Sequence, residues 1–400
     1  MGKIAVIGQC LRHYISFADY NLVRIAFKKK GILRDDRVHL EAAIRWLCRA
    51  QDVFNDGGVA RSFSMVYHPY FKRKGWISSY PETTGYIIPT MFDCAREMKS
   101  QELYDRACQM ADWECDVQLE NGAVKGGTID QKPTTAAVFN TGQVIFGWLR
   151  AFQETRQERF LNSAIKAGQF LVGQQDEDGA WRKSASAFTS SRMEFRTYNT
   201  RTAWALLELS QVCGEAAFAD AAVANIEFAL KQQKDNGWFE SNCLSDPTQP
   251  LLHTIAYCIR GIMEVGAALN EQRYVERARK AADQLIRQQI ADGSLAGRFN
   301  EKWEHAVSWS CLTGDAQMAI IWGRLYQITM EGNYLDAHSQ MNKYLKKVQL
   351  LHIKNRDIFG GLCGSDPVSG PYGKYEILNW AVKFFVDALL LEKSIKGSQA

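Results

Sequence analysis

Two kinds of apolar segment alternate along this chain. In segments such as Tyr104–Gln118, Phe160–Gln175, Ala217–Gln233 and Arg273–Gln289, apolar residues recur three and four positions apart, which is the spacing of one helix face. In the intervening segments, such as residues 143–152 and 316–325, nearly every position is apolar, as in a helix that is buried on all sides. The pattern therefore predicts amphipathic outer helices that alternate with apolar inner helices.

A glycine-containing turn recurs six times, mostly after glutamine and an acid or amide. The turn glycines are Gly58, Gly122, Gly179, Gly237, Gly293 and Gly360, and the last copy lacks the acid or amide. Asp-Gly and Asn-Gly end helices because these residues tolerate a positive φ. Successive turns lie about 60 residues apart, a period that fits two helices with their loops. We expect the second helices to begin near Glu82, Asn140, Asn199, His253, Thr313 and Asn379.

Six such helix pairs predict an all-α protein of one domain, an (α/α)6 toroid with inner and outer rings over residues 37–392. A helical extension, residues 1–36, is expected before it, and a flexible tail, residues 393–400, after it. Residues 11–30 mix apolar and basic side chains, a composition that also suits an amphipathic helix in peripheral contact with a membrane.

The turn sequences resemble a known repeat. Residues 174–181 (Gln-Gln-Asp-Glu-Asp-Gly-Ala-Trp) and 232–238 (Gln-Gln-Lys-Asp-Asn-Gly-Trp) are similar to the QW repeat of the α/α-toroid superfamily, which includes terpene cyclases and protein prenyltransferase β subunits. The same double ring occurs in uronate epimerases, polysaccharide lyases, unsaturated glucuronyl hydrolases and N-acyl-glucosamine epimerases. The resemblance implies the fold, whereas the chemistry has to be argued from the site.

The topology predicts where that site lies. All inner helices run in the same direction, so their N-termini, with unpaired N–H groups and partial positive charge, meet at one mouth of the ring and favour an anionic ligand. The polar residues of the loops and first inner turns are the candidates. Those expected to be catalytic are Glu82, His253, Tyr257, Tyr375 and Glu376; those expected to bind substrate are His68, Tyr70, Trp76, Asn140, Arg192, Arg196, Asn199, Arg201, His305, Trp309, Asp315, Gln317 and Tyr372.

Three reactions are compatible with these residues. His253 and Tyr257 are spaced i, i+4 and share a helix face, so they could exchange a proton with the carbon beside a carboxylate while arginines and helix N-termini hold the carboxylate and Glu82 assists. Epimerisation and elimination follow from this arrangement. Hydrolysis would instead need a carboxylate pair, such as Glu82 with Asp315 or Glu376.

Composition narrows the function further. The net charge of +4, from 48 basic and 44 acidic residues, gives no basic footprint for nucleic acid. The ten cysteines are scattered, without a Cys-x-x-Cys pair, which indicates a reduced, cytoplasmic protein. A cytoplasmic location favours a role in the synthesis of a polysaccharide over the digestion of an external one. We expect no metal or cofactor.

Two alternatives stay open. The chain lacks the Asp-x-Asp-Asp and Asp-Asp-x-x-Asp motifs of isoprenoid enzymes, and a terpene cyclase-like enzyme would need a dry cavity lined by Trp and Phe. The other alternative is a non-catalytic glycan-binding or scaffold protein of a polysaccharide biosynthesis complex. The leading hypothesis is an enzyme that acts on an acidic, uronate-containing glycan or glycan precursor.

Overall fold

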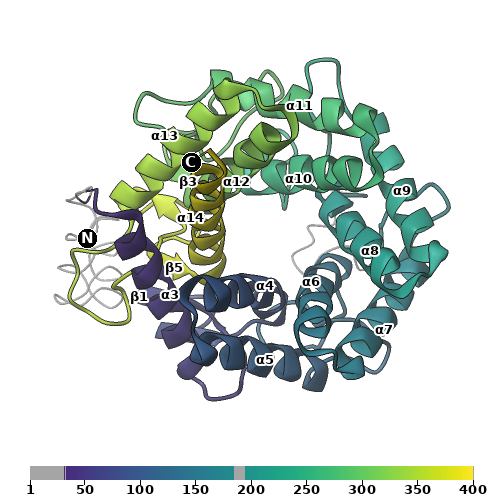
Figure 1. Cartoon of the computed structure of the whole chain (residues 1–400). Helices are drawn as coiled ribbons and strands as arrows, with labels where there is room; N and C mark the ends of the chain where they lie inside the picture. Colours follow the sequence, from purple (N-terminus) through teal and green to yellow (C-terminus); the bar gives the residue numbers. More distant parts are fainter. Residues whose placement is uncertain (1–30, 32, 184–193, 400) are drawn as a thin grey trace, which may run out of the picture.

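The helices form two concentric rings. The computed structural model describes residues 31, 33–183 and 194–399. Within this part the outer helices are α3 (Asp36–Asp52), α5 (Gln101–Asp116), α7 (Glu158–Gln174), α9 (Ala216–Lys231), α11 (Gln272–Arg287) and α13 (Gly332–Val348). The inner helices are α4 (Pro81–Met98), α6 (Val138–Thr155), α8 (Thr200–Cys213), α10 (Leu252–Leu269), α12 (Leu312–Thr329) and α14 (Asn379–Gln399). Each outer helix lies outside an inner one, and α14 closes the circle by packing on α12, α4 and α3 (Figure 1).

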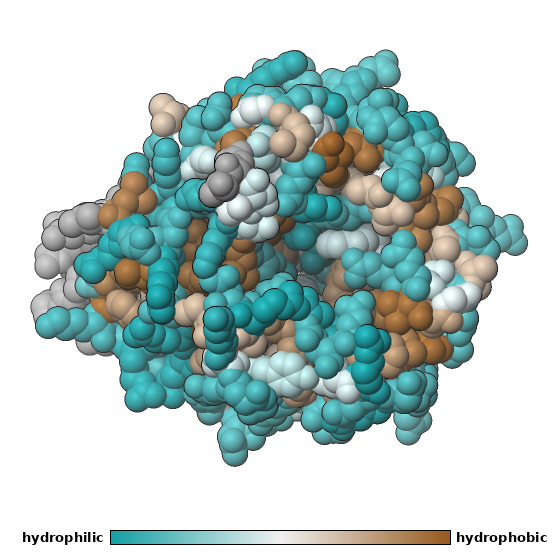
Figure 2. Space-filling view, in the orientation of Figure 1, coloured by the Kyte–Doolittle hydropathy of each residue, from teal (hydrophilic) through white to brown (hydrophobic). Residues whose placement is uncertain are grey.

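The burial of the two kinds of helix follows their sequence pattern. In α11 the buried residues, among them Tyr274, Ala278 and Leu285, lie on one face, whereas nearly all of α10 is buried. The inner helices start within two residues of the predicted positions. Figure 2 shows that the ring is hollowed near its centre and that both hydrophilic and hydrophobic side chains lie around the hollow. The predicted all-α toroid is therefore confirmed.

The glutamine of each turn links neighbouring hairpins. Gln175 Nε2 donates to the carbonyl of the turn residue Gly179 at 3.0 Å and to the Ala221 carbonyl of the next outer helix at 2.9 Å. Gln51, Gln118, Gln233 and Gln289 make the same pair of bonds in their own turns. The sequence pattern is thus explained by a repeated hydrogen-bonded clamp between hairpins.

The sixth clamp closes the ring. Gln349 Nε2 donates to the Gly360 carbonyl at 2.9 Å and to the His39 carbonyl of α3 at 3.0 Å. The sixth turn therefore also has a clamping glutamine. Gln349 lies 11 positions before Gly360, so the sequence pattern missed it. In the first turn the positive-φ glycine is Gly57 (φ 95°) rather than Gly58.

Short strands, which the sequence analysis did not predict, join the loops at one mouth. β1 (Ala60–His68) pairs antiparallel with β2 (Arg73–Ser79) and with β5 (Glu376–Leu378), in the order β2-β1-β5. β3 (Ser310–Cys311) pairs with β4 (Ser365–Asp366). The three-stranded sheet brings the first long loop beside the last one.

Both ends of the predicted domain can be compared with the structure. At the C-terminal end, α14 continues to Gln399, so residues 393–399 are helical, and the expected flexibility of this tail stays a prediction. Lys396 pairs with Asp36 of α3 at 3.0 Å and with Glu392 at 2.9 Å, which ties this last turn to the ring. The proposed membrane-contact segment, residues 11–30, lies outside the described residues. Among those described, no helix has the length and apolar character needed to cross a bilayer.

Candidate functional site

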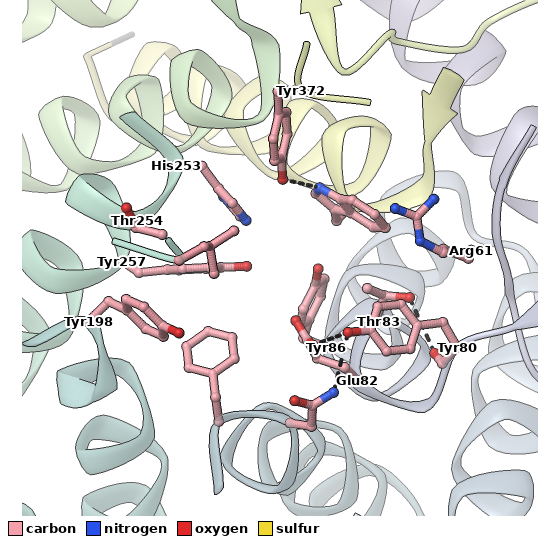
Figure 3. Close-up of a pocket in the computed structure, with 14 residues that line it drawn as sticks. Arg61, Tyr80, Glu82, Thr83, Tyr86, Tyr198, His253, Thr254, Tyr257 and Tyr372 are labelled. Atoms are coloured by element: carbon pink, nitrogen blue, oxygen red, sulfur yellow. Dashed lines mark hydrogen bonds between the residues drawn. The ribbon is translucent and has the colours of Figure 1, made fainter. Parts of the chain in front are cut away.

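A cavity of about 190 Å³ lies at the mouth where the inner helices begin. Its walls come mainly from the first turns of α4, α6, α10 and α14, from β1 and from the loops above them. It is lined by Arg61, Tyr80, Glu82, Thr83, Tyr86, Phe139, Asn140, Tyr198, Leu244, His253, Thr254, Tyr257, Tyr372 and Trp380. Figure 3 shows His253 and Tyr257 on one side, Arg61 and Tyr80 on the opposite side, and Tyr372 between them. We call it the front pocket.

Glu82 is the carboxylic acid of the front pocket. It is half-buried in the first turn of α4, and the Tyr80 hydroxyl donates a hydrogen bond to its Oε2 at 2.5 Å. Asn140 Nδ2 in turn donates to the Tyr80 hydroxyl at 3.3 Å. Burial raises the pKa of Glu82 to about 7, although the Tyr80 hydrogen bond and the charges of Arg201 and Arg61 oppose the rise. A carboxyl with this pKa can both accept and donate a proton near neutral pH.

His253, in the first turn of α10, is held as a neutral imidazole. Gln317 Nε2 lies 2.7 Å from His253 Nδ1 and also faces the Thr313 carbonyl at 3.4 Å, which fixes the amide nitrogen toward the ring. Burial, with a smaller effect of the Arg201 charge, lowers the pKa of His253 to about 3. Because Nδ1 accepts the Gln317 hydrogen, the ring proton belongs on Nε2. His253 is therefore a hydrogen-bond donor to a ligand and not a strong base.

Arg61 enters the front pocket from β1. Its Nη1 donates to Glu376 Oε2 at 2.6 Å and to Ser62 Oγ at 2.9 Å. The guanidinium lies 5.0 Å from the ring centre of Trp380, which fixes its plane. Arg61 was not among the predicted residues, since its place in the site depends on the pairing of β1 with β5.

The structure places two predicted catalytic residues, Glu376 and Tyr375, outside the lining of the front pocket. Glu376 is not in the wall of the front pocket; burial would raise its pKa, but the Arg61 charge and hydrogen bonds from His68 and Ser62 lower it to about 2. His68 Nε2 lies 3.3 Å from Glu376 Oε1, so it supports this anchor instead of facing the front pocket. Tyr375 also lies outside the lining, with its backbone in the left-handed region (φ 60°) and its carbonyl bonded to the Met65 N–H. Glu376 is an ionised anchor for Arg61 and not a proton donor.

Tyr257 and Tyr372 of the front pocket stay protonated. Burial raises the pKa of Tyr257 far above its ordinary value, and it raises the pKa of Tyr372 as well. A hydroxyl with a raised pKa is a hydrogen-bond donor at neutral pH, and the role of Tyr257 as a base stays a prediction. The Tyr372 hydroxyl accepts a hydrogen bond from Trp380 Nε1 at 2.8 Å, so its own proton is available to a ligand oxygen.

Several predicted substrate-binding residues have structural contacts elsewhere. Tyr70 is exposed and its hydroxyl accepts from Gln131, and the Trp76 ring packs 5.3 Å from the Trp46 ring. His305 Nε2 lies 3.1 Å from the Gln288 carbonyl. Trp309 packs so closely on Gly297 that a Cβ there would meet its ring at 2.3 Å. These four residues stabilise loops outside the front pocket.

The other predicted binding residues lie behind or beside the front pocket. Asp315 is fully buried beside the backbone of Leu295 and is not among the residues that line the front pocket. Arg196 and Asn199 are buried at the start of α8 next to the lining residue Tyr198. Arg201, the second residue of α8, is buried and is not among the lining residues. Gln317 acts through His253 as described above. Arg192 lies outside the described residues.

The lining thus contains the predicted Glu82, Asn140, His253, Tyr257 and Tyr372. Tyr80, Thr83 and Tyr86 also line the front pocket but were not predicted as site residues. They lie within four residues of Glu82 at the start of α4, and this proximity could have identified them. Other lining residues likewise lie at or near the start of an inner helix: Phe139, Tyr198, Thr254 and Trp380. Leu244 comes from a loop that no pattern singled out. Among the described residues, no cluster of three His, Cys, Asp or Glu could hold a metal ion.

Comparisons with known proteins agree with this architecture. A family model described as the squalene-hopene cyclase C-terminal domain matches residues 133–261. No curated protein matches the chain by sequence. The structure is similar to that of an unsaturated glucuronyl hydrolase specific for heparin, with a TM-score of 0.71, 15% identity, and coverage of 90% of this chain and 98% of that chain.

Two sugar epimerases are also similar in structure. For a sugar epimerase from a ruminal bacterium the TM-score is 0.72, the identity 14%, and the coverage 90% of this chain and 98% of that chain. For cellobiose 2-epimerase from Bacillus thermoamylovorans the corresponding values are 0.67, 13%, 88% and 97%. At this identity the likeness concerns the fold: the chain is an α/α toroid whose structural neighbours include carbohydrate-active enzymes.

Proposed function

We propose that this protein is an enzyme that transfers a proton to or from a carbon of an acidic sugar residue, with Glu82 as the acid–base group. The observation that carries the proposal is the Glu82 carboxyl itself, which has a pKa of about 7 and lines a cavity where helix N-termini meet. A general acid or base is most effective when its pKa lies near the working pH. Structural neighbours that are named as a glucuronyl hydrolase and as epimerases support the carbohydrate class.

The carboxyl groups favour proton transfer over hydrolysis by a carboxylate pair. Most glycoside hydrolases place two carboxyl groups on either side of the scissile bond. Among the lining residues Glu82 is the one carboxylic acid, while Glu376 is bonded to Arg61 and Asp315 is buried outside the cavity. We therefore favour epimerisation or elimination, which need a base, a means of stabilising the enolate and a returning acid.

The residues of the front pocket can supply these roles, with Glu82 acting as the base and, once protonated, as the acid that returns the proton. The carboxylate form of Glu82 removes the proton from the carbon beside the substrate carboxylate. Both hydrogen bonds of Arg61 given above use Nη1, so its other nitrogens can bind that carboxylate. The Nε2–H of His253 and the hydroxyl of Tyr257 would donate to the developing enolate oxygen, whose charge the helix N-termini also favour. Here Glu82 takes the role of base that the sequence analysis gave to His253 or Tyr257.

The lining also bears on the alternatives. Five tyrosine hydroxyls, a carboxyl, an imidazole and a guanidinium line the front pocket, which suits a hydroxylated ligand better than an isoprenoid. A scaffold protein has no need of a carboxyl that titrates near neutral pH. A setting in polysaccharide biosynthesis and a cytoplasmic location stay predictions of the sequence.

Exchange of substrate hydrogen for solvent deuterium tests this proposal directly. Uronic acids, oligosaccharides that end in a uronate, and neutral disaccharides would be incubated with the protein in D₂O and followed by NMR. We expect deuterium to enter an acidic sugar at the carbon beside its carboxylate. Glu82→Gln should abolish the exchange, while Glu120→Gln, at an exposed position, serves as the matched control.

Two results would contradict the proposal. Exchange at the wild-type rate in Glu82→Gln would remove Glu82 from the reaction. Binding of an acidic sugar without exchange, elimination or hydrolysis would instead favour a non-catalytic glycan-binding protein.

A further inference from the structure

A second and larger cavity, of about 880 Å³, lies inside the ring behind the front pocket. It is lined by parts of all the inner helices of the described chain, and Tyr86 contributes to both cavities. We call it the rear cavity. Its charged lining includes Arg201, Glu208, Arg260, Arg324, Lys383 and Asp387.

Arg201 is a fully buried guanidinium in the wall between the two cavities. Its Nε donates to Gln143 Oε1 at 2.5 Å, while its Nη1 is buried without a hydrogen-bond partner among the described residues. The group lies 5.1 Å from the ring centre of Tyr257 and 5.3 Å from that of Trp204, and no carboxylate of the described chain pairs with it. A buried charge without a counter-ion is strongly destabilising. Aromatic faces offset only part of this cost.

Two further cations, the half-buried Arg260 and the buried Lys383, approach the same space. Arg260 lies 5.0 Å from the Trp204 ring centre, and its Nε also has no hydrogen-bond partner among the described residues. Lys383 Nζ lies 4.5 Å from the ring centre of Phe384. The charges of Arg260 and Arg201 each help to lower the pKa of Lys383 to about 8, after the larger effect of burial. The three cations therefore repel one another across the rear cavity.

The acidic residues in and beside the rear cavity do not balance these cations. Asp93 and Glu97, which line it, pair with Arg150 and Lys393 respectively. Asp387 Oδ2 pairs with Lys383 at 2.5 Å. Glu264 is shared, at 3.6 Å from Arg260 and 3.1 Å from Arg324. Burial and the Glu264 charge raise the pKa of Glu208 to about 7, so this carboxyl carries only part of a charge at neutral pH. Arg201 is left without a compensating anion.

We propose that the rear cavity binds a small, multiply charged anion of the carboxylate or phosphate class, held by Arg201, Arg260 and Lys383. Arg201 Nη1, which has no hydrogen-bond partner among the described residues, and the guanidinium of Arg260, whose Nε makes only a 3.6 Å ion pair with Glu264, supply donors. The bound anion provides the missing counter-charge. This site is separate from the front pocket, where Arg61 is the cation. It therefore does not depend on the reaction proposed for Glu82.

Titration calorimetry and thermal denaturation at low ionic strength would test this site with two probes. Inorganic pyrophosphate represents the phosphate class and citrate the carboxylate class. We expect at least one of them to bind and to raise the melting temperature, because a ligand that binds only the folded state stabilises it. Binding of one probe alone identifies the class, and binding of both indicates a general anion site.

Four variants locate the bound anion. Arg260→Met should weaken binding at least about tenfold, since a charge-assisted hydrogen bond is lost while Glu264 keeps its pair with Arg324. Arg201→Met should weaken it further, and Arg260→Met keeps the test decisive if the Arg201 variant does not fold. Arg61→Met, in the front pocket, and Arg45→Met, on the outer surface of α3, should leave binding unchanged.

Three outcomes would overturn the inference. The first is that neither pyrophosphate nor citrate binds at millimolar concentration. The second is wild-type affinity in Arg260→Met and in a folded Arg201→Met. The third is loss of binding in Arg61→Met, which would place the anion in the front pocket. Glu82→Gln should bind the probes normally, so failure of this site and failure of the proposed reaction can be told apart.

Discussion

The side-chain amide of Gln317, on α12, lies 2.7 Å from Nδ1 of His253 on the neighbouring helix α10. This contact sets which nitrogen of the imidazole carries the proton and so makes Gln317 a positioning residue. Replacing Gln317 with Glu would offer an acceptor to Nδ1–H and free Nε2 of its proton. We expect kcat to fall by about 10- to 100-fold with a smaller change in KM, the range seen when such supporting partners are lost.

Nitrogen NMR of the histidine side chains would report the tautomer directly. His253 should change from the Nε2–H to the Nδ1–H form in Gln317→Glu, and the exposed Gln272→Glu variant should leave it unchanged. An unaltered tautomer together with wild-type kcat would show that Gln317 does not position His253.

Glu82 should influence stability in a direction that depends on pH. Its folded-state pKa is raised from 4.5 to about 7 by burial. The protonated group therefore contributes relative stability that is fully present below about pH 4.5 and is lost as the pH rises through about 7. Glu82→Gln should melt like the wild type near pH 4, yet be more stable by up to about 3 kcal/mol near pH 8. Thermal melts at both pH values, with Glu120→Gln alongside, measure this difference; an equal gain at both would contradict the raised pKa.

Tyr80 should tune the pH dependence of the reaction. Its hydroxyl donates to Glu82 and favours the carboxylate, so Tyr80→Phe removes an effect that lowers the pKa of Glu82. If the carboxylate is the base, kcat/KM rises with pH through about 7 in the wild type, and this limb should move upward by about one pH unit in Tyr80→Phe. Tyr104→Phe, on the outer helix α5, is the control. A limb that stays in place would mean that another group controls the pH dependence.

Local sequence signals were sufficient for the hairpins and for part of the front pocket. Each helix pair is marked by its own periodicity and turn, and Glu82, Asn140 and His253 lie in first turns whose positions follow from those marks. Because the inner helices are parallel, their first turns meet at one mouth of the ring. These residues could therefore be predicted without knowing which segments remote in sequence contact one another.

The residues that were missed or misplaced depend on contacts that are remote in sequence. Arg61 reaches the front pocket on a strand, and its Glu376 partner is 315 positions away. Gln349 lies 11 positions before Gly360, whereas the other clamps span only a few residues, so the sixth repeat appeared incomplete. Asp315 was misplaced because an acidic residue in a first inner turn can also be buried without lining the cavity.

Substitution of two glycines, Gly360 and Gly214, should distinguish the stability lost through a strained backbone from the stability lost when the contact that closes the ring is disturbed. Gly360 has φ +87°, and a Cβ added there would meet the Ala42 carbonyl oxygen of α3 at 2.1 Å. Gly214 has a similar φ of +80°, but nothing lies within 4 Å of an added Cβ. Gly214→Ala should therefore cost about 1 kcal/mol of unfolding free energy, the strain of a left-handed alanine. Gly360→Ala should cost a further 1–3 kcal/mol or so, because the contact between the last turn and α3 has to open. Urea denaturation of both variants gives the comparison, and equal losses would mean that this contact contributes little to the stability of the ring.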